Sequence, residues 1–188
     1  MQWIFGAIEE LVPVILFFVA QMQYGFTVGV AVMVISTIVI LVFTKLLGRT
    51  VPKFAIMSTL GVLLFAVPTL VTGDASYFQV SDTILDGAFA LMLLGSVVLK
   101  RPILKFFFAR IFALTDEAWR ILTIRWGVLF LVLAILNEFI RLSYSTEVWS
   151  LFKLAATVSI VLFGCFQFTL SRKMRIPGES NSLGLRIK

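Results

Sequence analysis

The sequence predicts an all-α membrane protein, a polytopic bundle of transmembrane helices with about five spans. Of its 188 residues, 60% are hydrophobic and only 14% are charged, whereas about a quarter of a typical soluble domain is charged. Three runs, 26–44, 54–73 and 154–171, contain no charged residue at all. About 20 helical residues cross the hydrocarbon core of a bilayer. Backbone groups in lipid must hydrogen-bond within the chain, so these runs are expected to be helices.

The long apolar runs and the breaks between them set the expected span boundaries. We expect spans at 26–44, 54–72, 83–99, 122–141 and 150–170, all within one transmembrane domain of residues 1–174. The segment that follows, 175–188, contains Pro177, Gly178 and several serines and asparagines. That composition is typical of disorder, and we expect a disordered cytoplasmic tail.

The segment 3–22 leaves the number of spans open. Its apolar stretch, Leu11 to Ala20, has the length of a re-entrant or interfacial segment rather than of a span. Five spans place the N-terminus outside the cytoplasm. If this segment crosses the membrane, the protein has six spans and a cytoplasmic N-terminus, and the other loops keep their sides.

Basic residues recur in every second loop. They gather between the first two expected spans, in the long connection after the third, and in the tail: Lys45, Arg49 and Lys53; Lys100, Arg101, Lys105, Arg110, Arg120 and Arg125; Arg172, Lys173, Arg175, Arg186 and Lys188. Loops rich in Lys and Arg stay on the cytoplasmic side. The net charge of +6 therefore indicates orientation in a membrane, with a cytoplasmic C-terminus, and not a nucleic-acid partner.

The connection after the third expected span is both basic and aromatic. The stretch from Lys105 to Phe112, which includes Arg110, is expected to form an amphipathic helix in the headgroup plane. With Lys100 and Arg101, Lys105 and Arg110 are candidate contacts to anionic lipids or to partner proteins. Thr115, followed by two acids, has the pattern of an N-cap, so a second helix is expected to begin there and run into the fourth span.

A few ionisable or polar residues fall within the expected spans. The candidate polar cluster consists of Asp86, Asn137, Glu138, Arg141 and Lys153. Ionisable groups in a membrane are costly and usually face other helices or water. They indicate either a proton or ion relay, or a structural ion pair with side chains that reach the outer interface. Asp82 and Asp86, four residues apart, form either a paired acid site or the start of a helix, and the helix start fits Asp82 well.

Nothing in the sequence has the pattern of an enzyme active site. The chain has no histidine and a single cysteine, Cys165, so the commonest general base and metal ligand are missing. It contains no Walker loop, GxGxxG, CxxC or GxSxG motif. We expect no catalytic residue, no cofactor and no metal site.

A set of residues between about 11 and 155 has an order and spacing that match one bacterial family. The matching residues are Lys100-Arg101-Pro102, Leu114-Thr115, Ala118-Trp119, Leu122, Trp126, Phe130, Asn137-Glu138, Ser145-Thr146, Trp149 and Phe152-Lys153, with Pro13, Phe17-Phe18 and Tyr24-Gly25-Phe26 nearer the N-terminus. On these residues the chain resembles the intracellular septation protein A family, whose members span the inner membrane. Gln79 to Thr83 departs from the family pattern, which indicates a divergent member.

The resemblance implies a five-span protein of the bacterial inner membrane, with a role in envelope integrity, cell shape and division. It also implies action through contacts with division or envelope-synthesis proteins, and supplies no catalytic residue. Two functions are therefore expected. One is a non-enzymatic scaffold; the other is a small carrier or channel for an ion or a lipid-linked substrate, which uses the charges within the membrane. The oligomeric state is left open.

Overall fold

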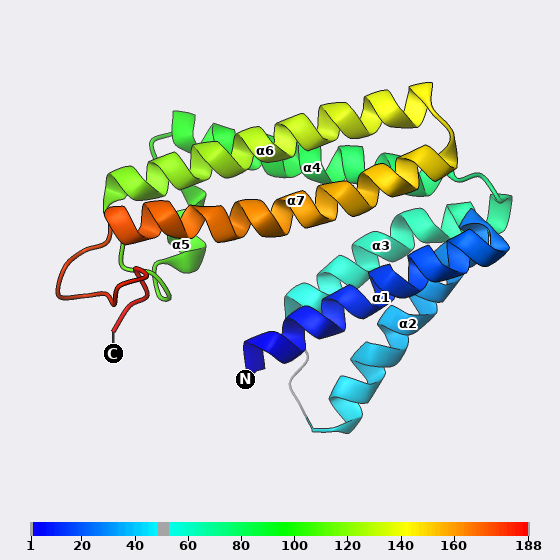
Figure 1. Ribbon diagram of the computed structural model, residues 1–188, viewed down its shortest axis with the longest axis horizontal. Helices are drawn as coiled ribbons and strands as arrows, with labels where there is room; N and C mark the ends of the chain where they lie inside the picture. The colour runs from blue at the N-terminus through cyan, green and yellow to red at the C-terminus, as the bar shows by residue number, and fades with distance from the viewer. Residues whose placement is uncertain (1, 49–52, 188) are drawn as a thin grey trace. The chain divides into compact units, whose positions relative to one another are not determined.

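The chain is built almost entirely of helices (Figure 1). The computed structural model describes the backbone of residues 2–48 and 53–187, and the side chains of residues 12–48 and 59–187. Within these residues it has seven helices and no strand: α1 (Gln2–Tyr24), α2 (Phe26–Leu46), α3 (Lys53–Thr72), α4 (Ser76–Val98), α5 (Ile103–Phe108), α6 (Asp116–Ser143) and α7 (Thr146–Lys173). Arg49, one of the predicted cytoplasmic basic residues, lies outside the described residues.

Four of the helices, α2, α4, α6 and α7, are long and apolar enough to cross a membrane. Two shorter apolar stretches, Val12–Tyr24 and Thr59–Thr72, lie in α1 and α3. The predicted all-α, polytopic fold is therefore confirmed. Three helices begin well before the expected spans: α4 begins at Ser76 and not at 83, α6 at Asp116 and not at 122, and α7 at Thr146 and not at 150. The earlier start of α6 agrees with the expected N-cap, since the Thr115 hydroxyl accepts a hydrogen bond from the Ala118 amide at 3.3 Å.

The chain divides into two compact units, Met1–Ser81 and Asp82–Lys188, with the boundary inside α4. The first unit holds α1, α2 and α3. Here the N-terminal segment is one continuous helix, α1, and not a short isolated apolar stretch. It packs on α2 where Gly29 has no side chain: a Cβ there would lie 2.9 Å from the Gln21 Cβ. Whether α1 crosses the membrane, and whether residues 1–174 act as one domain, stay predictions.

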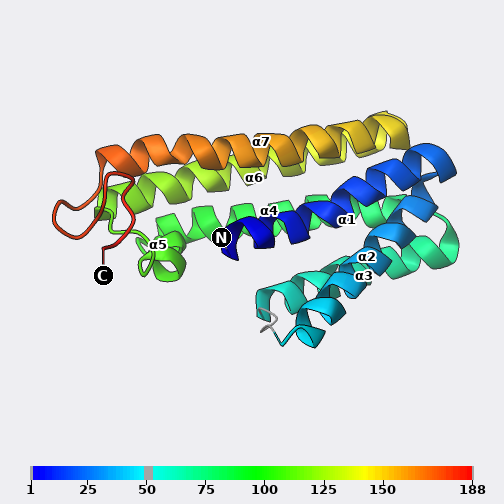
Figure 2. The ribbon, with the colours of Figure 1, turned by 60° about the horizontal axis from the view of Figure 1, so that its bottom comes forward.

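The second unit is a bundle of α4, α6 and α7. Figures 1 and 2 show α6 and α7 side by side along their length. Gly127 brings α6 against α4, because a Cβ there would lie 2.7 Å from a Leu94 methyl group. The Trp126 ring contacts the Phe163 ring edge-on, with the centroids 5.1 Å apart. Small and aromatic residues thus set the spacing of this bundle, as is usual for helices in membranes.

The structure describes the tail through residue 187 as a folded segment, whereas its composition led us to expect disorder. It folds back onto the connection between α5 and α6. The Ala113 amide donates to the Gly184 carbonyl at 3.0 Å, and the backbone amide of Arg186 donates to the Ile111 carbonyl at 2.8 Å. The same connection ends the expected amphipathic helix early, because α5 stops at Phe108. Its backbone groups pair with the tail instead of continuing a helix.

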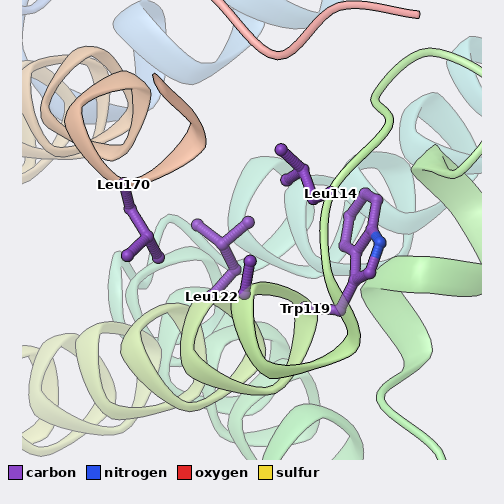
Figure 3. Close-up of a cluster of buried hydrophobic side chains, with 5 residues drawn as sticks. Leu114, Trp119, Leu122 and Leu170 are labelled. Atoms are coloured by element: carbon purple, nitrogen blue, oxygen red, sulfur yellow. The ribbon is translucent and has the colours of Figure 1, made fainter. Parts of the chain in front are cut away.

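Buried apolar residues hold this end of the bundle together. Figure 3 shows the cluster formed by Leu114, Trp119, Leu122 and Leu170, to which Ala118 also belongs. It joins the connection, the first turns of α6 and the last turns of α7. We call the connection 109–115 together with the folded tail 174–187 the terminal module.

Candidate intramembrane polar site and basic recess

An ion pair lies near the C-terminal end of α6. Arg141 donates from Nη2 to Glu138 Oε1 at 2.6 Å and from Nε to Glu138 Oε2 at 3.0 Å. The two residues lie one turn apart, so α6 itself positions them. A two-pronged guanidinium–carboxylate pair is among the strongest of ionic contacts and has a fixed geometry. Sequence reasoning placed both residues in the candidate polar cluster, and the structure joins them directly.

Hydrogen bonds extend from this pair across three helices. Thr83 of α4 donates its hydroxyl to Glu138 Oε2 at 3.0 Å and accepts from the Asn137 amide nitrogen at 2.8 Å. Asn137 in turn accepts from the Trp149 indole nitrogen of α7 at 2.7 Å. Asn137 and Trp149 are both buried, at 1% and 0% exposure. One amide side chain therefore connects α4, α6 and α7 in the interior of the bundle.

A second ion pair joins α4 and α7, between Lys153 and Asp82. The Lys153 ammonium group also lies 5.3 Å from the centre of the Trp149 ring, a cation–π distance. Asp82 was expected to start a helix. In the structure it lies more than a turn inside α4, which begins at Ser76, so its part is a contact between helices.

Asp86, one turn further along α4, faces a small cavity of about 100 Å³. The cavity is also lined by Asp82, Asn137 and Lys153, and by apolar residues of α6 and α7. Among the described residues Asp86 makes no hydrogen bond and no ion pair. Of the five predicted cluster residues, three therefore belong to one hydrogen-bonded network, while Asp86 and Lys153 meet at the neighbouring cavity.

Sequence reasoning left Thr83 and Trp149 out of this site and gave Asp82 a different role. A signal for Asp82 was present, because Lys153 lies within a span and needs an acid on another helix. Thr83 and Trp149 are residue types that fit equally well at a helix surface or a membrane interface. Only the packing of α4 and α7 against Asn137 gives them their part in the network.

The four predicted basic contact residues divide between two places. Lys100, Arg101 and Lys105 line an open recess of about 570 Å³, together with Arg120, Asp116, Glu117 and apolar side chains; we call it the basic recess. Lys105 there donates to Asp116 Oδ1 at 2.5 Å. Arg110 is exposed on the terminal module, outside the lining of the recess.

No arrangement typical of a bound metal occurs in the part of the chain that the structure describes. Groups of three or more His, Cys, Asp or Glu side chains placed to hold an ion are absent there. The groups of this site form hydrogen bonds and ion pairs, and two carboxyl groups, those of Asp82 and Asp86, line its cavity.

Comparison with known proteins identifies relatives along almost the whole chain. The family model of intracellular septation protein A matches residues 6–175. An inner membrane-spanning protein YciB of Afipia carboxidovorans is 31% identical over 174 residues, covering 92% of this chain and 87% of the relative. The YciB of Rhizobium meliloti is 36% identical over 146 residues, covering 77% and 70%. The YciB of Nitrobacter hamburgensis is 29% identical over 174 residues, covering 92% and 87%. No solved structure matches the chain.

Proposed function

We propose that this chain, which belongs to the intracellular septation protein A family, is a non-enzymatic scaffold of the bacterial inner membrane. Its relatives are named for spanning the inner membrane. In the scaffold role, the chain supports septation, cell shape and the integrity of the envelope. It does so by holding division or envelope-synthesis proteins at its cytoplasmic end. The C-terminus lies in the cytoplasm in this proposal, as the distribution of basic residues predicts.

The observation that carries the proposal is the terminal module. A disordered tail would offer only charge, whereas this tail pairs with residues 109–115 through backbone hydrogen bonds and isolated bridges such as Leu114 with Arg175. The module exposes Arg110 and Arg186 on a folded surface. A folded surface binds partners at a lower entropic cost than a disordered segment, which must be ordered on binding.

The polar network supports the same function from inside the bundle. Its carboxylate, amide and indole groups bond to one another, and no buried side-chain polar atom among the described residues lacks a hydrogen-bond partner. Satisfied polar networks make a packed arrangement rigid and specific. A rigid bundle suits a platform for other proteins better than a pathway that must open and close.

Complementation of a strain that lacks its own copy of the gene tests the proposal. Gly184 has φ +84°, and a Cβ there would lie 3.0 Å from both Leu114 Cδ2 and the Ser171 carbonyl, so Gly184→Val should release the tail. The matched control is Ser182→Val, which adds the same side chain at an exposed position of the same tail. Cell length, shape and envelope leakage are measured, with protein abundance checked in the membrane fraction.

We expect Gly184→Val to accumulate normally yet leave the defects of the deletion strain, while Ser182→Val restores normal cells. Full complementation by Gly184→Val at normal abundance would contradict the proposed role of the terminal module.

A second function, transport of an ion or a small substrate, is favoured by one observation: Asp86 faces a cavity and has no bonded partner among the residues that the structure describes. Glu138 is a weaker candidate for binding a transported ion, because its two carboxylate oxygens already accept hydrogen bonds from Arg141 and Thr83. A carrier would show flux in reconstituted vesicles that Asp86→Asn abolishes. Flux equal to that of empty vesicles would exclude this function for the protein alone.

A further inference from the structure

We propose that the basic recess is a binding site for the phosphate headgroup of an anionic phospholipid. The inference does not rest on the scaffold function, because it concerns a different surface from the terminal module. Its lining combines Lys100, Arg101, Lys105 and Arg120 with Asp116 and Glu117, and with the apolar side chains of Val97, Pro102 and Phe106.

The place of the recess along the chain is that of a lipid headgroup. It begins at the end of α4, a helix long and apolar enough to cross a membrane, and continues into the first turn of α6. Val98, beside it, is 81% exposed, and Phe106 on its wall is 83% exposed. Exposed apolar side chains such as these are favourable where they contact lipid acyl chains and not water. Aromatic and basic residues are common at the membrane interface.

Charge pairing within the recess leaves two cations for a ligand. Lys105 pairs with Asp116 at 2.5 Å, and Arg120 lies 3.7 Å from Glu117. Lys100 and Arg101 have no acidic partner and no side-chain hydrogen bond among the described residues. A guanidinium group binds phosphate oxygens in a two-pronged manner, and an ammonium group adds a point charge. The two paired acids disfavour a highly charged ligand and suit a single phosphodiester.

The backbone positions these two cations. The Arg101 amide donates to the Ser96 carbonyl at 2.9 Å, and the Ile103 amide donates to the Ser96 hydroxyl at 3.1 Å. The turn requires φ +54° at Lys100, a conformation that glycine adopts readily and that other residues adopt at a cost. A lysine at this position therefore serves something other than the turn, and Lys100 is part of the lining of the recess.

The size of the recess also fits a headgroup. A volume of about 570 Å³ lies within the range of about 300 to 1,000 Å³ found for small-molecule sites. The apolar wall formed by Val97, Pro102 and Phe106 leads toward the exposed apolar end of α4. A soluble phosphate would leave this wall unused, whereas the glycerol backbone and the first acyl carbons of a phospholipid would cover it.

Native mass spectrometry of the purified full-length protein tests the proposal. Phosphatidylglycerol, phosphatidylethanolamine and phosphatidylcholine with identical acyl chains are titrated separately, and glycerol 3-phosphate is added as a soluble competitor. We expect phosphatidylglycerol to bind most tightly. Lys100→Gly together with Arg101→Gln should weaken it roughly 10- to 30-fold, since each basic residue at an anionic surface contributes a factor of a few. Lys100→Gly removes the ammonium group while easing the turn, so the melting temperature should not fall.

The matched control, Lys45→Gln together with Arg172→Gln, removes the same charge from exposed positions elsewhere in the chain and should change the affinity less than about threefold. Equal losses in the two double variants would mean diffuse attraction, and equal binding of the three lipids would mean no headgroup recognition. Competition by glycerol 3-phosphate at the lipid's own concentration would mean a site for soluble anions. Each of these three results would overturn the proposal.

Discussion

Single polar side chains carry much of the specificity of the bundle, and Asn137 is the clearest case. It is almost fully buried, donates to Thr83 of α4 and accepts from Trp149 of α7. Apolar packing against lipid distinguishes poorly between one helix rotation and another, since lipid tails are as apolar as leucine. A buried amide that bonds two neighbours fixes which faces of α4 and α7 turn inward.

We predict that Asn137→Ala lowers the free energy of unfolding by about 1–3 kcal/mol. The substitution removes the amide oxygen that accepts from Trp149 and the amide nitrogen that donates to Thr83, both of them in a buried place. Ser159→Ala is the control, since that exposed hydroxyl donates to the Ala155 carbonyl of its own helix and has no other bond within the described part of the chain. Unfolding in mixed micelles measures both variants. A change of less than about 0.5 kcal/mol for Asn137→Ala, equal to the control, would mean that the network adds no stability.

Two ion pairs, Glu138 with Arg141 and Asp82 with Lys153, lie beside this amide. Breaking one partner of a partly buried pair is more harmful than losing both, because the remaining charge is left in an apolar place. A variant that neutralises Glu138 or Arg141 alone is therefore expected to lower the stability of the protein, whatever its effect on function. Protein abundance has to be measured before any loss of function is assigned to these residues.

At the scale of helices, the distance between α4 and α6 depends on Gly127. Its hydrogen faces Leu94 and Leu93, and any larger side chain would overlap them: an added Cβ would lie 2.8 Å from Leu94 Cγ and 3.3 Å from Leu93 Cβ. Gly95, on α4 itself, has open space where a Cβ would stand. The two glycines thus allow a matched comparison within one helix pair.

We predict that Gly127→Ala destabilises the protein by about 1–3 kcal/mol through overpacking. Gly95→Ala should leave stability unchanged or raise it by up to about 1 kcal/mol, because alanine is the better helix former. The melting temperature of each purified variant, measured in the same detergent, decides the matter. Equal behaviour of the two variants would contradict the close contact of α4 and α6.

At the scale of the whole molecule, the proposed scaffold function depends on which end of the bundle faces the cytoplasm. The tail and the connection before α6 lie at one end of the α6–α7 pair (Figure 1), and the turn between these helices lies at the other. Both the tail and the connection are rich in basic residues. The positive-inside rule assigns the basic end to the cytoplasm. The scaffold proposal requires this orientation, because the terminal module has to meet cytoplasmic partners.

Single-cysteine labelling measures the orientation. With Cys165 replaced by serine, Ser182→Cys in the tail should react with a membrane-impermeant maleimide only after the cells are opened. Ser143→Cys, exposed at the end of α6, should react in intact cells that have a permeable outer membrane. The reverse pattern would place the terminal module outside the cytoplasm and contradict the scaffold proposal.

The fold class was predictable from the sequence, because uncharged runs such as 26–44 are long enough to cross a membrane only as helices. The sequence also identified Asn137, Glu138, Arg141 and Lys153 as candidates, since polar groups within apolar runs are costly and therefore conspicuous. The N-cap at Thr115 followed from residues adjacent in the chain. Properties set by composition or by nearest neighbours were thus predictable.

The folded tail and the contacts between helices became visible only in the three-dimensional structure. The polar tail 175–187 has no apolar run from which a folded segment could be predicted. It is held by backbone hydrogen bonds to residues more than 60 positions away, such as the bond from Ala113 to Gly184. The same pairing ends α5 at Phe108. The pairing of Asp82 with Lys153 and the bonding of Trp149 to Asn137 depend on how α4 and α7 are rotated against α6. A one-dimensional pattern of hydrophobicity does not specify that rotation, because it records which residues are apolar and not which faces of two helices meet.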